Sequence, residues 1–468
     1  MPHLRIISLF FLLSLWACKT EKNTQPSSVD QEFEELFSKS HEADLFHGTA
    51  LIFKEGQEVY KGAFGFSNAE AKTPMKVENI FRLASVSKQF TCMTIMLLKE
   101  QGKLDYDQDI RDFIPELPYE GITIRHLMQH TSGIPDYVSL FEENWKTDLA
   151  EDDPERFIEG NEHIISMVAE KKPERHFAPG EKWEYSNMAY VTLAVITARV
   201  SGMPFADFAK QNIFDPLGME NTSYYDFIPG PDPHMPLRTF GFYKDLDGSY
   251  KPNDSNYLNP AKGDGGIYST VDDLLKWDRA LYTDKLVSKE SLEEAFTPGK
   301  LANGDTHHYG FGWGIGESPN GKKVVSHSGG WVGYRTFIYR EIEEDNCIIL
   351  LSNNSSNSLG KVLDQAKNIL HGKAFEIPKE SPTVSLGKTL YNEGVEEGLQ
   401  AFQELKDEFL AIKADNPWAL AYELEYLAET LVEKGKSKEA IEVYKMLIDF
   451  EVGEKENHQA KIEELEQG

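Results

Sequence analysis

The chain has two blocks of apolar, strand-like segments that lie far apart in the sequence. The first, GTALIFKEGQEVYKGAFGFSN, consists of two apolar, partly alternating stretches around Glu55 and Gly56. Alternation with a period of two, broken by a short glycine-containing turn, is typical of a β-hairpin. The second block, residues 321–370, begins with GKKVVSHSGG, continues with YRTFIYREIEEDNCIILLSNN and ends with GKVLDQAKNIL. It predicts a strand, a strand, a turn, a strand and a helix.

The segments between these blocks have helical patterns, including Ser87–Gln101 and Met188–Ser201. Strands at both ends of a region with helices between them favour an antiparallel sheet whose halves come from distant parts of the sequence. We therefore expect an α/β (α+β) fold over residues 33–372, with an antiparallel sheet flanked by helices and a helical subdomain. Such a sheet brings residues hundreds of positions apart to one edge.

The C-terminal part is rich in glutamate and has a helical pattern. After a linker over residues 373–385, the region 386–468 contains LEYLAETLVEKGKSKEAIEVYKMLI, which fits a tetratricopeptide-like repeat. The positions that fit are Leu424, Leu427, Ala428, Leu431, Gly435, Ala440, Tyr444 and Leu447. Fewer than three clear repeats rarely form a stable unit, so we expect this small all-α region to pack on the main domain. It serves either as a helical cap or as a surface for a protein partner.

The N-terminus, residues 1–18, reads MPHLRIISLFFLLSLWAC and has the layout of a secretory signal, with a short basic start and an apolar centre. Its end, LWAC, resembles a bacterial lipobox, which predicts lipidation of Cys18; Trp16 is unusual there and leaves cleavage by the general signal peptidase open. A polar tether follows over residues 19–32. We expect export to the bacterial periplasm or cell surface, with contact to the membrane through the lipid anchor alone.

Composition narrows the range of partners. The chain has 48 Lys and Arg against 77 Asp and Glu, a formal net charge of -29. Such a surface repels phosphate backbones, so nucleic acid is not expected as a partner. The remaining cysteines, Cys92 and Cys347, both lie in apolar runs, and we expect two buried thiols.

A charged residue at the start of the apolar run FRLASVSKQFTCMTIMLL is the first candidate for chemistry. Lys88 follows Ser85 by three positions, so the two side chains share a face if a helix begins near Ser85. A serine hydroxyl is a weak nucleophile until a base takes its proton, and a neutral lysine amine can do so. The spacing alone is also found in ordinary exposed serine and lysine pairs.

Two other clusters fit the same chemistry. WEYSNMAYVTL places Tyr185 and Asn187 two residues apart, which in an extended segment puts both side chains on one side. VVSHSGGWVGY ends a predicted strand with His327, Ser328 and two glycines, Gly329 and Gly330. Residues this small allow a substrate to approach the backbone N–H groups.

Taken together, Ser85-Val-Ser-Lys88, Tyr185-Ser-Asn187 and His327-Ser-Gly329 resemble the three motifs of the penicillin-recognising serine hydrolases. The tyrosine-containing second motif is similar to the class C β-lactamase branch, with its D,D-peptidase and esterase relatives. The stretches LMQHTSGIPDY, GDGGIYSTVDDLLKW and YGFGWGI, at 127–137, 263–277 and 309–315, support that branch. The resemblance covers residues 33–372 and leaves out the repeats.

The resemblance implies a role for each matching residue. Ser85 would be the acylated nucleophile, Lys88 its partner in proton transfer, and Tyr185 the general base. Asn187 would position the substrate and Lys88. The oxyanion hole would consist of the backbone N–H groups of Ser85 and Gly330. Whether Lys88 or Tyr185 is the base stays open, because a coupled pair titrates as a unit.

The third motif departs from the pattern, since His327 stands where the superfamily has lysine. A histidine is neutral over much of the physiological range, so a fixed positive charge that faces a substrate carboxylate is lost or depends on pH. This weakens the case for efficient β-lactamase activity. Ser328 keeps the hydroxyl of the middle position, so a carboxylate or carbonyl can still be recognised there.

These expectations converge on an exported serine hydrolase that acts through an acyl-enzyme on a small-molecule or short-peptide amide or ester, with D-amino-acyl peptides as the leading class. Carboxylesterase and weak β-lactamase activity are alternatives, and an inactive anchored scaffold is the alternative of another kind. No cofactor or metal is expected. His126 and His130 have the spacing of a helical zinc pair, but the glutamate of that motif is replaced by Leu127. His130 is therefore expected to hold the adjacent turn.

Overall fold

The computed structural model describes residues 28–145, 149–150, 153–225, 233–356 and 358–467. The predicted signal segment, Cys18 and most of the tether lie outside the described residues. The tether predicted over 19–32 ends earlier than expected, because helix α1 (Ser28–Glu42) already begins at Ser28. Its residues Phe33, Leu36 and Phe37 are fully buried, and this apolar stripe stabilises the helix against the sheet.

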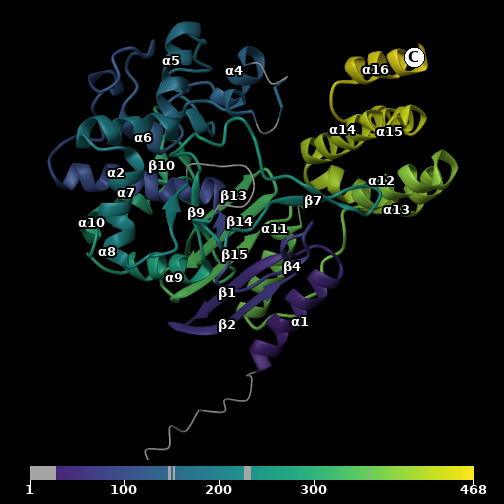
Figure 1. The fold of residues 1–468 in the computed structure, drawn as a ribbon, viewed down its shortest axis with the longest axis horizontal. Coiled ribbons are helices and arrows are strands. Elements are labelled where there is room, and N and C mark those ends of the chain that lie inside the picture. Colours follow the sequence, from purple (N-terminus) through teal and green to yellow (C-terminus); the bar gives the residue numbers. More distant parts are fainter. Residues whose placement is uncertain (1–27, 146–148, 151–152, 226–232, 357, 468) are drawn as a thin grey trace, which may run out of the picture.

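A six-stranded antiparallel sheet lies at the centre of the fold and has the order β12-β13-β14-β15-β1-β2 (Figure 1). Its strands are β1 (Gly48–Lys54), β2 (Gln57–Phe64), β12 (Gly314–Glu317), β13 (Lys323–Trp331), β14 (Tyr334–Glu341) and β15 (Asn346–Ser352). Leu51 of β1 pairs with Ile349 of β15, so the two distant blocks of the sequence meet in mid-sheet. The predicted hairpin, the three later strands and their antiparallel assembly are confirmed.

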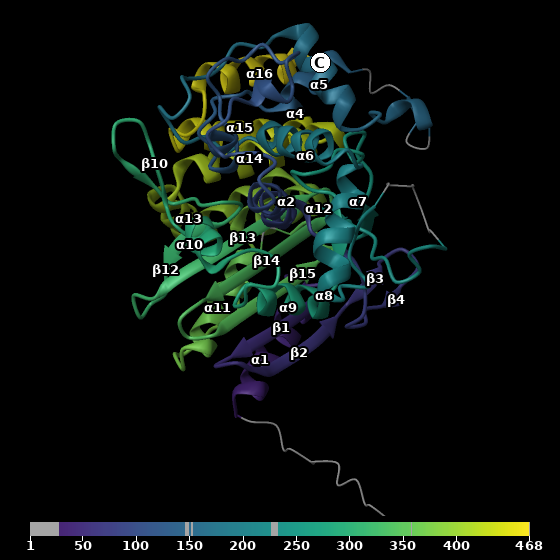
Figure 2. The same cartoon turned by 90° about the vertical axis from the view of Figure 1, so that its left-hand side faces the viewer.

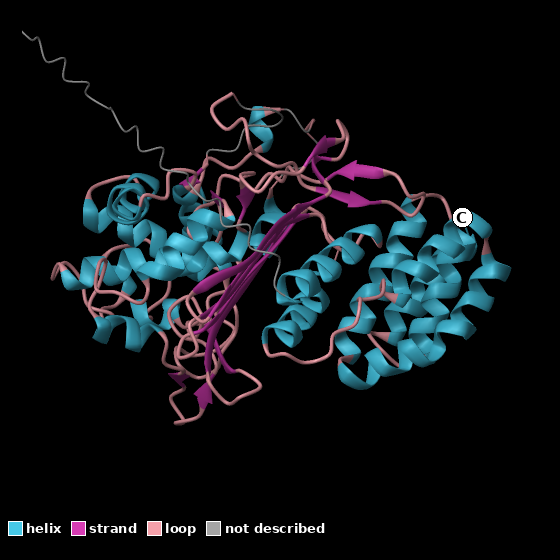
Figure 3. Ribbon diagram, turned by 90° about the horizontal axis from the view of Figure 1, so that it is seen from below, coloured by secondary structure: helices cyan, strands magenta, loops and turns pink. Residues whose placement is uncertain are grey.

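Helices cover both faces of the sheet, which Figure 3 shows nearly edge-on. On one face, α1 and α11 (Leu359–Leu370) pack against Ala50 and Ile52 of β1. On the other face lies the larger core, which contains Leu51. This division follows from the strand itself, because successive side chains point to opposite faces. The larger core includes α2 (Lys88–Glu100), α6 (Asn187–Ser201) and α9 (Val271–Ala280).

The chain between β2 and β12 forms the helical subdomain and several short hairpins (Figure 2). Its further helices are α3 (Ile124–Met128), α4 (Tyr137–Asn144), α5 (Asn161–Lys171), α7 (Phe205–Ala209), α8 (Asp215–Leu217) and α10 (Lys289–Ala295), with the short turns η1 (Ala84–Ser87), η2 (Ile110–Asp112), η3 (Pro154–Arg156) and η4 (Lys210–Phe214). Its strands are β3 (Phe66–Asn68), β4 (Thr73–Pro74), β5 (Phe81–Arg82), β6 (Ser223–Tyr224), β7 (Phe242–Lys244), β8 (Tyr250–Pro252), β9 (Ile267–Ser269), β10 (Gly299–Lys300) and β11 (Thr306–His307).

Five helices after the sheet form the C-terminal helical unit, residues 382–467 (Figure 1). They are α12 (Pro382–Glu393), α13 (Val395–Asp415), α14 (Pro417–Glu433), α15 (Ser437–Asp449) and α16 (Lys455–Gln467). The unit begins at Pro382 rather than at 386, because Ser381 caps α12 and proline suits a first helical position. It has a hydrophobic core of its own.

The C-terminal helical unit packs on the main part of the chain. Leu246, from the β7–β8 hairpin, packs against the core of the unit. Lys434 Nζ forms an ion pair of 2.7 Å with Asp245, and Asn392 donates a hydrogen bond of 3.0 Å to the Leu246 carbonyl. The expected packing is therefore present, whereas the likeness to tetratricopeptide repeats stays a prediction.

None of the described helices is both long and apolar enough to span a membrane by itself. The helices over Asn187–Ser201 and Phe205–Leu217 meet the criterion only as a pair, with a bend of 79° between them. Most residues of α6 are buried in the core, which accounts for its apolar composition. Cys92 and Cys347 are both free and buried, as predicted.

Candidate active site

Ser85 lies in a strained turn between strand β5 and helix α2. The residue before it, Ala84, has a φ of 48°, a left-handed conformation that is uncommon outside glycine. Ser85 belongs to the short turn η1, and α2 itself begins at Lys88, so the regular helix starts later than expected. Thr336 Oγ1 on β14 holds the turn through a hydrogen bond of 2.6 Å to the Leu83 carbonyl. The sheet therefore fixes the Ser85 backbone from outside the motif.

Gly329 on β13 makes this close approach possible. A Cβ atom at residue 329 would lie 2.2 Å from the Leu83 carbonyl oxygen and 3.2 Å from the Ser85 nitrogen. Real Cβ atoms do not approach backbone oxygens this closely, so a larger residue would push the strand away from Ser85. The sequence predicted that small residues make room for a substrate; at residue 329, the Ser85 turn itself occupies that room.

Lys88 is fully buried and makes three hydrogen bonds through its ammonium nitrogen. The distances from Nζ are 3.0 Å to Ser85 Oγ, 2.8 Å to Asn187 Oδ1 and 2.7 Å to the Asp264 carbonyl. The structure thus brings together three of the four residues predicted to act on the proton and the substrate, or to position them. The Ser85–Lys88 spacing alone also fitted an exposed lysine. In the structure the Lys88 side chain faces the interior of the protein and not the solvent.

Two protonation states fit this geometry. A charged lysine has three N–H donors, and they match the three acceptors Ser85 Oγ, Asn187 Oδ1 and the Asp264 carbonyl. In that state Lys88 stabilises a deprotonated Ser85. A neutral lysine keeps two donors and accepts the proton of Ser85 instead. The site can therefore use Lys88 either as an electrostatic partner or as a base.

Tyr185 lies beside this group, half-buried, with its ring centroid 4.8 Å from Lys88 Nζ. His130 orders the segment that carries it: its Nδ1 accepts a hydrogen bond of 3.1 Å from the Ser186 N–H, and its carbonyl accepts one from the Glu184 N–H. Its ring packs against Tyr185 with centroids 4.3 Å apart. Burial lowers the pKa of His130 well below its usual value, which keeps Nδ1 available as an acceptor.

Asn187 begins helix α6 and is held by Asp136, a residue that the sequence analysis did not single out. Asp136 Oδ2 accepts hydrogen bonds from the Asn187 N–H at 2.8 Å and from its Nδ2 at 3.0 Å. The two donated bonds turn the Asn187 Oδ1 toward Lys88. The neighbouring Tyr137 donates a hydrogen bond of 2.9 Å to Asp264, whose own carbonyl accepts from Lys88. Burial raises the pKa of Asp264, and the nearby charge of Lys88 opposes that rise.

The third motif is arranged differently from the expectation. His327 is buried, while Ser328 and Gly330 are exposed on the other side of β13. His327 Nε2 lies 2.8 Å from the Tyr309 hydroxyl, and Nδ1 lies 2.6 Å from the Ser328 carbonyl. Nδ1 must donate to that carbonyl, so in the neutral ring Nε2 accepts from Tyr309. Burial, aided by the charge of Lys88, lowers the pKa of His327 to about 3. His327 therefore offers no positive charge at neutral pH.

A small cavity lies over Ser85. Residues of distant segments line it, namely Arg82, Ala84, Ser85, Tyr137, Asn187, Leu258, Ala261, Asp264, Gly265, Gly330 and Trp331. The cavity includes both residues whose N–H groups were predicted to form the oxyanion hole, Ser85 and Gly330. Preorganised N–H donors at such a place stabilise the negative charge that develops on a carbonyl oxygen under attack.

Possible metal ligands lie elsewhere. His126 Nδ1 accepts from the Thr123 N–H at the start of α3, so this histidine, like His130, is used in a hydrogen bond to the backbone. Among the described residues, one group of ligand atoms could together hold a metal ion: Glu341, Glu344 and His371. Glu341 lies at one end of β14, and Arg335, which pairs with Gly330, lies near the other end. The six positions that separate them correspond to roughly 20 Å at the usual rise per strand residue, so this group is distant from the cavity over Ser85.

The comparisons with known proteins identify the family of this chain. The sequence profile of the Beta-lactamase family matches residues 33–370. Penicillin-binding protein 4* of Bacillus subtilis is 39% identical over 354 residues, which span 74% of this chain and 76% of that protein. A D-aminopeptidase of Gluconobacter oxydans is 25% identical over 312 residues, which span 66% of this chain and 56% of the relative.

Among solved structures, a penicillin binding protein from Bacillus halodurans superposes with a TM-score of 0.61 at 25% identity. The match covers 73% of this chain and 98% of that one. The C-terminal helical unit lies outside the residues that the family profile covers. The chain therefore belongs to the beta-lactamase family and is a serine hydrolase of the penicillin-recognising superfamily.

Proposed function

We propose that this serine hydrolase cleaves D-amino-acyl peptides through an acyl-enzyme formed on Ser85. The observation that carries the proposal is the contact of the buried Lys88 with both Ser85 and Asn187 beside a cavity that Gly330 also lines. The names of the relatives, a penicillin-binding protein and a D-aminopeptidase, support the choice of substrate class.

The proposed reaction has two halves. Ser85 Oγ attacks the carbonyl carbon while Lys88 or Tyr185 takes its proton, and the carbonyl oxygen, now negative, is held by the N–H groups of Ser85 and Gly330. The C–N bond then breaks, the departing amine receives the proton, and the acyl group stays on Ser85. In the second half, water loses a proton to the same base and attacks the ester, which releases the acid and restores Ser85.

The neutral His327 bears on the choice among substrates. A β-lactam or a D-peptide with a free C-terminus presents a carboxylate, and His327 supplies no charge for it. Carboxylesterase activity and weak β-lactamase activity are the second candidates within the same chemistry. An inactive scaffold is disfavoured, because none of the residues that the motifs predict is missing from the cavity or from its surroundings.

A turnover panel tests the substrate class. The panel compares a short-chain ester, a D-Ala-D-Ala peptide and a chromogenic cephalosporin at matched concentrations. The proposal predicts that the D-peptide has the highest kcat/KM of the three and that Ser85→Ala abolishes its turnover. A higher kcat/KM for the ester or for the cephalosporin would reassign the enzyme to that class.

Export with a lipid anchor at Cys18 completes the proposal. Its support is the sequence alone: an apolar segment that ends in LWAC and is followed by a polar stretch. In a bacterial host, the full chain should partition into the detergent phase and the Cys18→Ser variant into the aqueous phase. Aqueous partition of both proteins would rule out the anchor.

A further inference from the structure

An arginine lies beside the predicted oxyanion hole. Arg335 of β14 pairs directly with Gly330 of β13. A Cβ atom at residue 330 would lie 3.7 Å from Arg335 Nη1, so the guanidinium group covers the exposed side of Gly330. Gly330 also lines the cavity over Ser85, so the guanidinium lies one strand away from the reacting centre. It is on the face of the sheet that α1 and α11 cover, whereas the Ser85 turn packs on the other face through Thr336.

The charge of Arg335 has no counter-ion among the described residues. Its Nη1 donates to two carbonyl oxygens, of Val332 at 3.1 Å and of Tyr334 at 2.8 Å, and no carboxylate lies within ion-pair distance. Burial lowers its pKa, although a guanidinium remains charged in any case. By contrast, the buried Arg238 and Arg340 both have aspartate partners. A half-buried cation with free donors is suited to an anionic ligand.

Arg335 also lines a second cavity, of about 360 Å³, between the main part of the chain and the C-terminal helical unit. Residues from both parts form its wall, among them Tyr243, Asn253, Arg335, Tyr422, Tyr426 and Thr430. Among the other cations of the wall, Lys244 and Lys388 have Asp44 and Glu380 as ion-pair partners, and Lys361 has no ion pair among the described residues. The wall also contains two carboxylates that are already bound, Asp245 by Lys434 and Glu423 by the Ser381 hydroxyl. The volume is in the range of cavities that bind small organic ligands.

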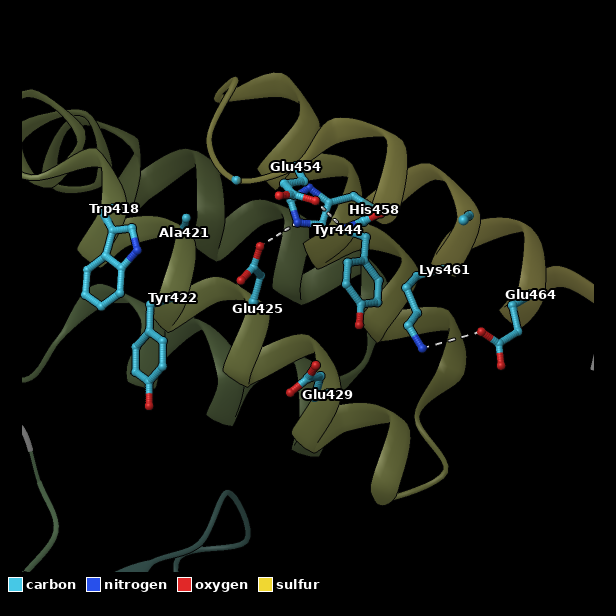
Figure 4. A pocket seen from close by; sticks show the side chains of 13 residues that line it. Trp418, Ala421, Tyr422, Glu425, Glu429, Tyr444, Glu454, His458, Lys461 and Glu464 are labelled. Atoms are coloured by element: carbon cyan, nitrogen blue, oxygen red, sulfur yellow. Dashed lines mark hydrogen bonds and ion pairs between the residues drawn. The ribbon is translucent and has the colours of Figure 1, made fainter. Parts of the chain in front are cut away.

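Helix α14 carries an aromatic row, of which Tyr422 and Tyr426 line this cavity while Trp418 lies outside its lining. Trp418, Tyr422 and Tyr426 follow one another at intervals of four residues, so they lie on one face of the helix, and they are 74%, 55% and 62% exposed. The rings of Trp418 and Tyr422 are stacked with centroids 5.8 Å apart and lie side by side in Figure 4. Large exposed aromatic side chains in a row are typical of a binding surface.

We infer that this second cavity is an extension of the substrate cleft, in which Arg335 binds a carboxylate of the substrate and Tyr422 and Tyr426 form the opposite wall. The inference rests on the proposed function for the nature of the substrate. Arg335 supplies the positive charge that His327 lacks, from the neighbouring strand. The aromatic wall limits the access of water to the ion pair, which strengthens the attraction. The C-terminal helical unit would thus take part in substrate recognition.

The test measures binding, so that it does not depend on turnover. The Ser85→Ala full-length protein is titrated by calorimetry with N-acetyl-D-Ala-D-Ala and with its C-terminal amide, which differ in the carboxylate alone. Hydrogen bonds to a charged group contribute about 1.5–3 kcal/mol, or roughly a 10- to 100-fold difference in Kd. We expect the free acid to bind at least tenfold more tightly than the amide.

Four variants in the Ser85→Ala background locate the effect. Arg335→Gln should remove the preference for the acid, Arg335→Lys should keep part of it, and the Tyr422→Ala, Tyr426→Ala double variant should reduce it severalfold. Arg82→Gln tests the rival position for the carboxylate, because Arg82 is a buried arginine without an ion pair that lines the Ser85 cavity itself. It should leave the preference unchanged.

Several results would overturn the inference: equal affinity for the two ligands, no binding of either at millimolar concentration, or a preference that survives Arg335→Gln and disappears with Arg82→Gln. Failure of the proposed function has a different signature. If the Ser85-containing enzyme does not hydrolyse the D-peptide but the acid preference depends on Arg335, the carboxylate site stands and the substrate class is wrong.

Discussion

Asp136 offers a direct test of how the site is positioned. It touches neither Ser85 nor Lys88 through any hydrogen bond in the described residues, yet it holds Asn187 through two bonds to Oδ2 and caps α4 through a bond of 3.0 Å from the Val138 N–H to Oδ1. The Asp136→Ala change removes all three. If Asn187 is needed to orient Lys88, the loss of Asp136 should slow the chemistry.

The expected loss of stability in Asp136→Ala can be worked out from these three hydrogen bonds. Hydrogen bonds to a charged acceptor contribute about 1.5–3 kcal/mol and a helix cap about 1 kcal/mol, but the half-exposed position lets water replace part of this. We expect the free energy of unfolding to fall by about 2–4 kcal/mol. A misplacement of a catalytic group by roughly 1 Å costs about 100-fold in rate, which we take as the expected loss in kcat. Asp136→Asn keeps one acceptor oxygen and should be intermediate.

The assay is the hydrolysis of a short-chain ester together with the rate of labelling by a fluorophosphonate, at a temperature where every variant is folded. The control is Asp109→Ala, which also removes an aspartate that caps a short helix and binds a second N–H, from Gly121, at 2.9 Å. It should lose similar stability and keep full activity. Equal kcat in Asp136→Ala and the parent enzyme, or a fall as large in Asp109→Ala, would refute the reasoning.

Two further predictions concern the buried titratable residues of the site, His327 and Lys88. Stability should fall as the pH drops from about 6.5 toward 3, since the folded state keeps His327 neutral while the unfolded state binds a proton near pH 6.5. Between pH 7 and pH 5 this effect amounts to about 2 kcal/mol, so urea unfolding of His327→Gln should show an acid loss smaller by that amount; an unchanged loss would mean that His327 is not buried as a neutral ring. Lys88→Ala should reduce fluorophosphonate labelling about 10²- to 10⁴-fold, and Lys88→Arg should not restore it, because arginine does not give up its proton. Labelling of Lys88→Ala at the parent rate would exclude Lys88 from the chemistry.

The parts of the fold that the sequence predicted are those with a local periodic signal. The hairpin around Gly56 has partly alternating stretches, β15 is a continuous apolar run between polar residues, and α2 and α6 are continuous apolar segments. The boundaries at residues 28 and 382 differ from prediction. The start at Ser28 lies in a polar stretch and depends on packing of the later residues Phe33, Leu36 and Phe37, whereas the start at Pro382 was readable from Ser381 as a cap and proline as a first helical residue.

The three motifs could be found because each is contained in a few consecutive residues. Thr336 and Asp136 could not be found in that way, since they act across 253 and 51 positions through the register of the sheet and the fold of the subdomain. The burial of His327 was readable in principle: it is two residues after Val325, a core position, so alternation places both on the inner face. The stretches LMQHTSGIPDY and YGFGWGI contained His130, Asp136 and Tyr309, but their sequence gives no indication of the partners.

The assignment of Ser85 as the nucleophile is tested most directly by mass spectrometry of the intact protein after reaction with a fluorophosphonate. Ser328 is the appropriate comparison, because it is an exposed serine on the strand that borders the site. The account predicts a single adduct on the parent enzyme and on Ser328→Ala, and none on Ser85→Ala. An adduct of equal yield on folded Ser85→Ala would contradict it.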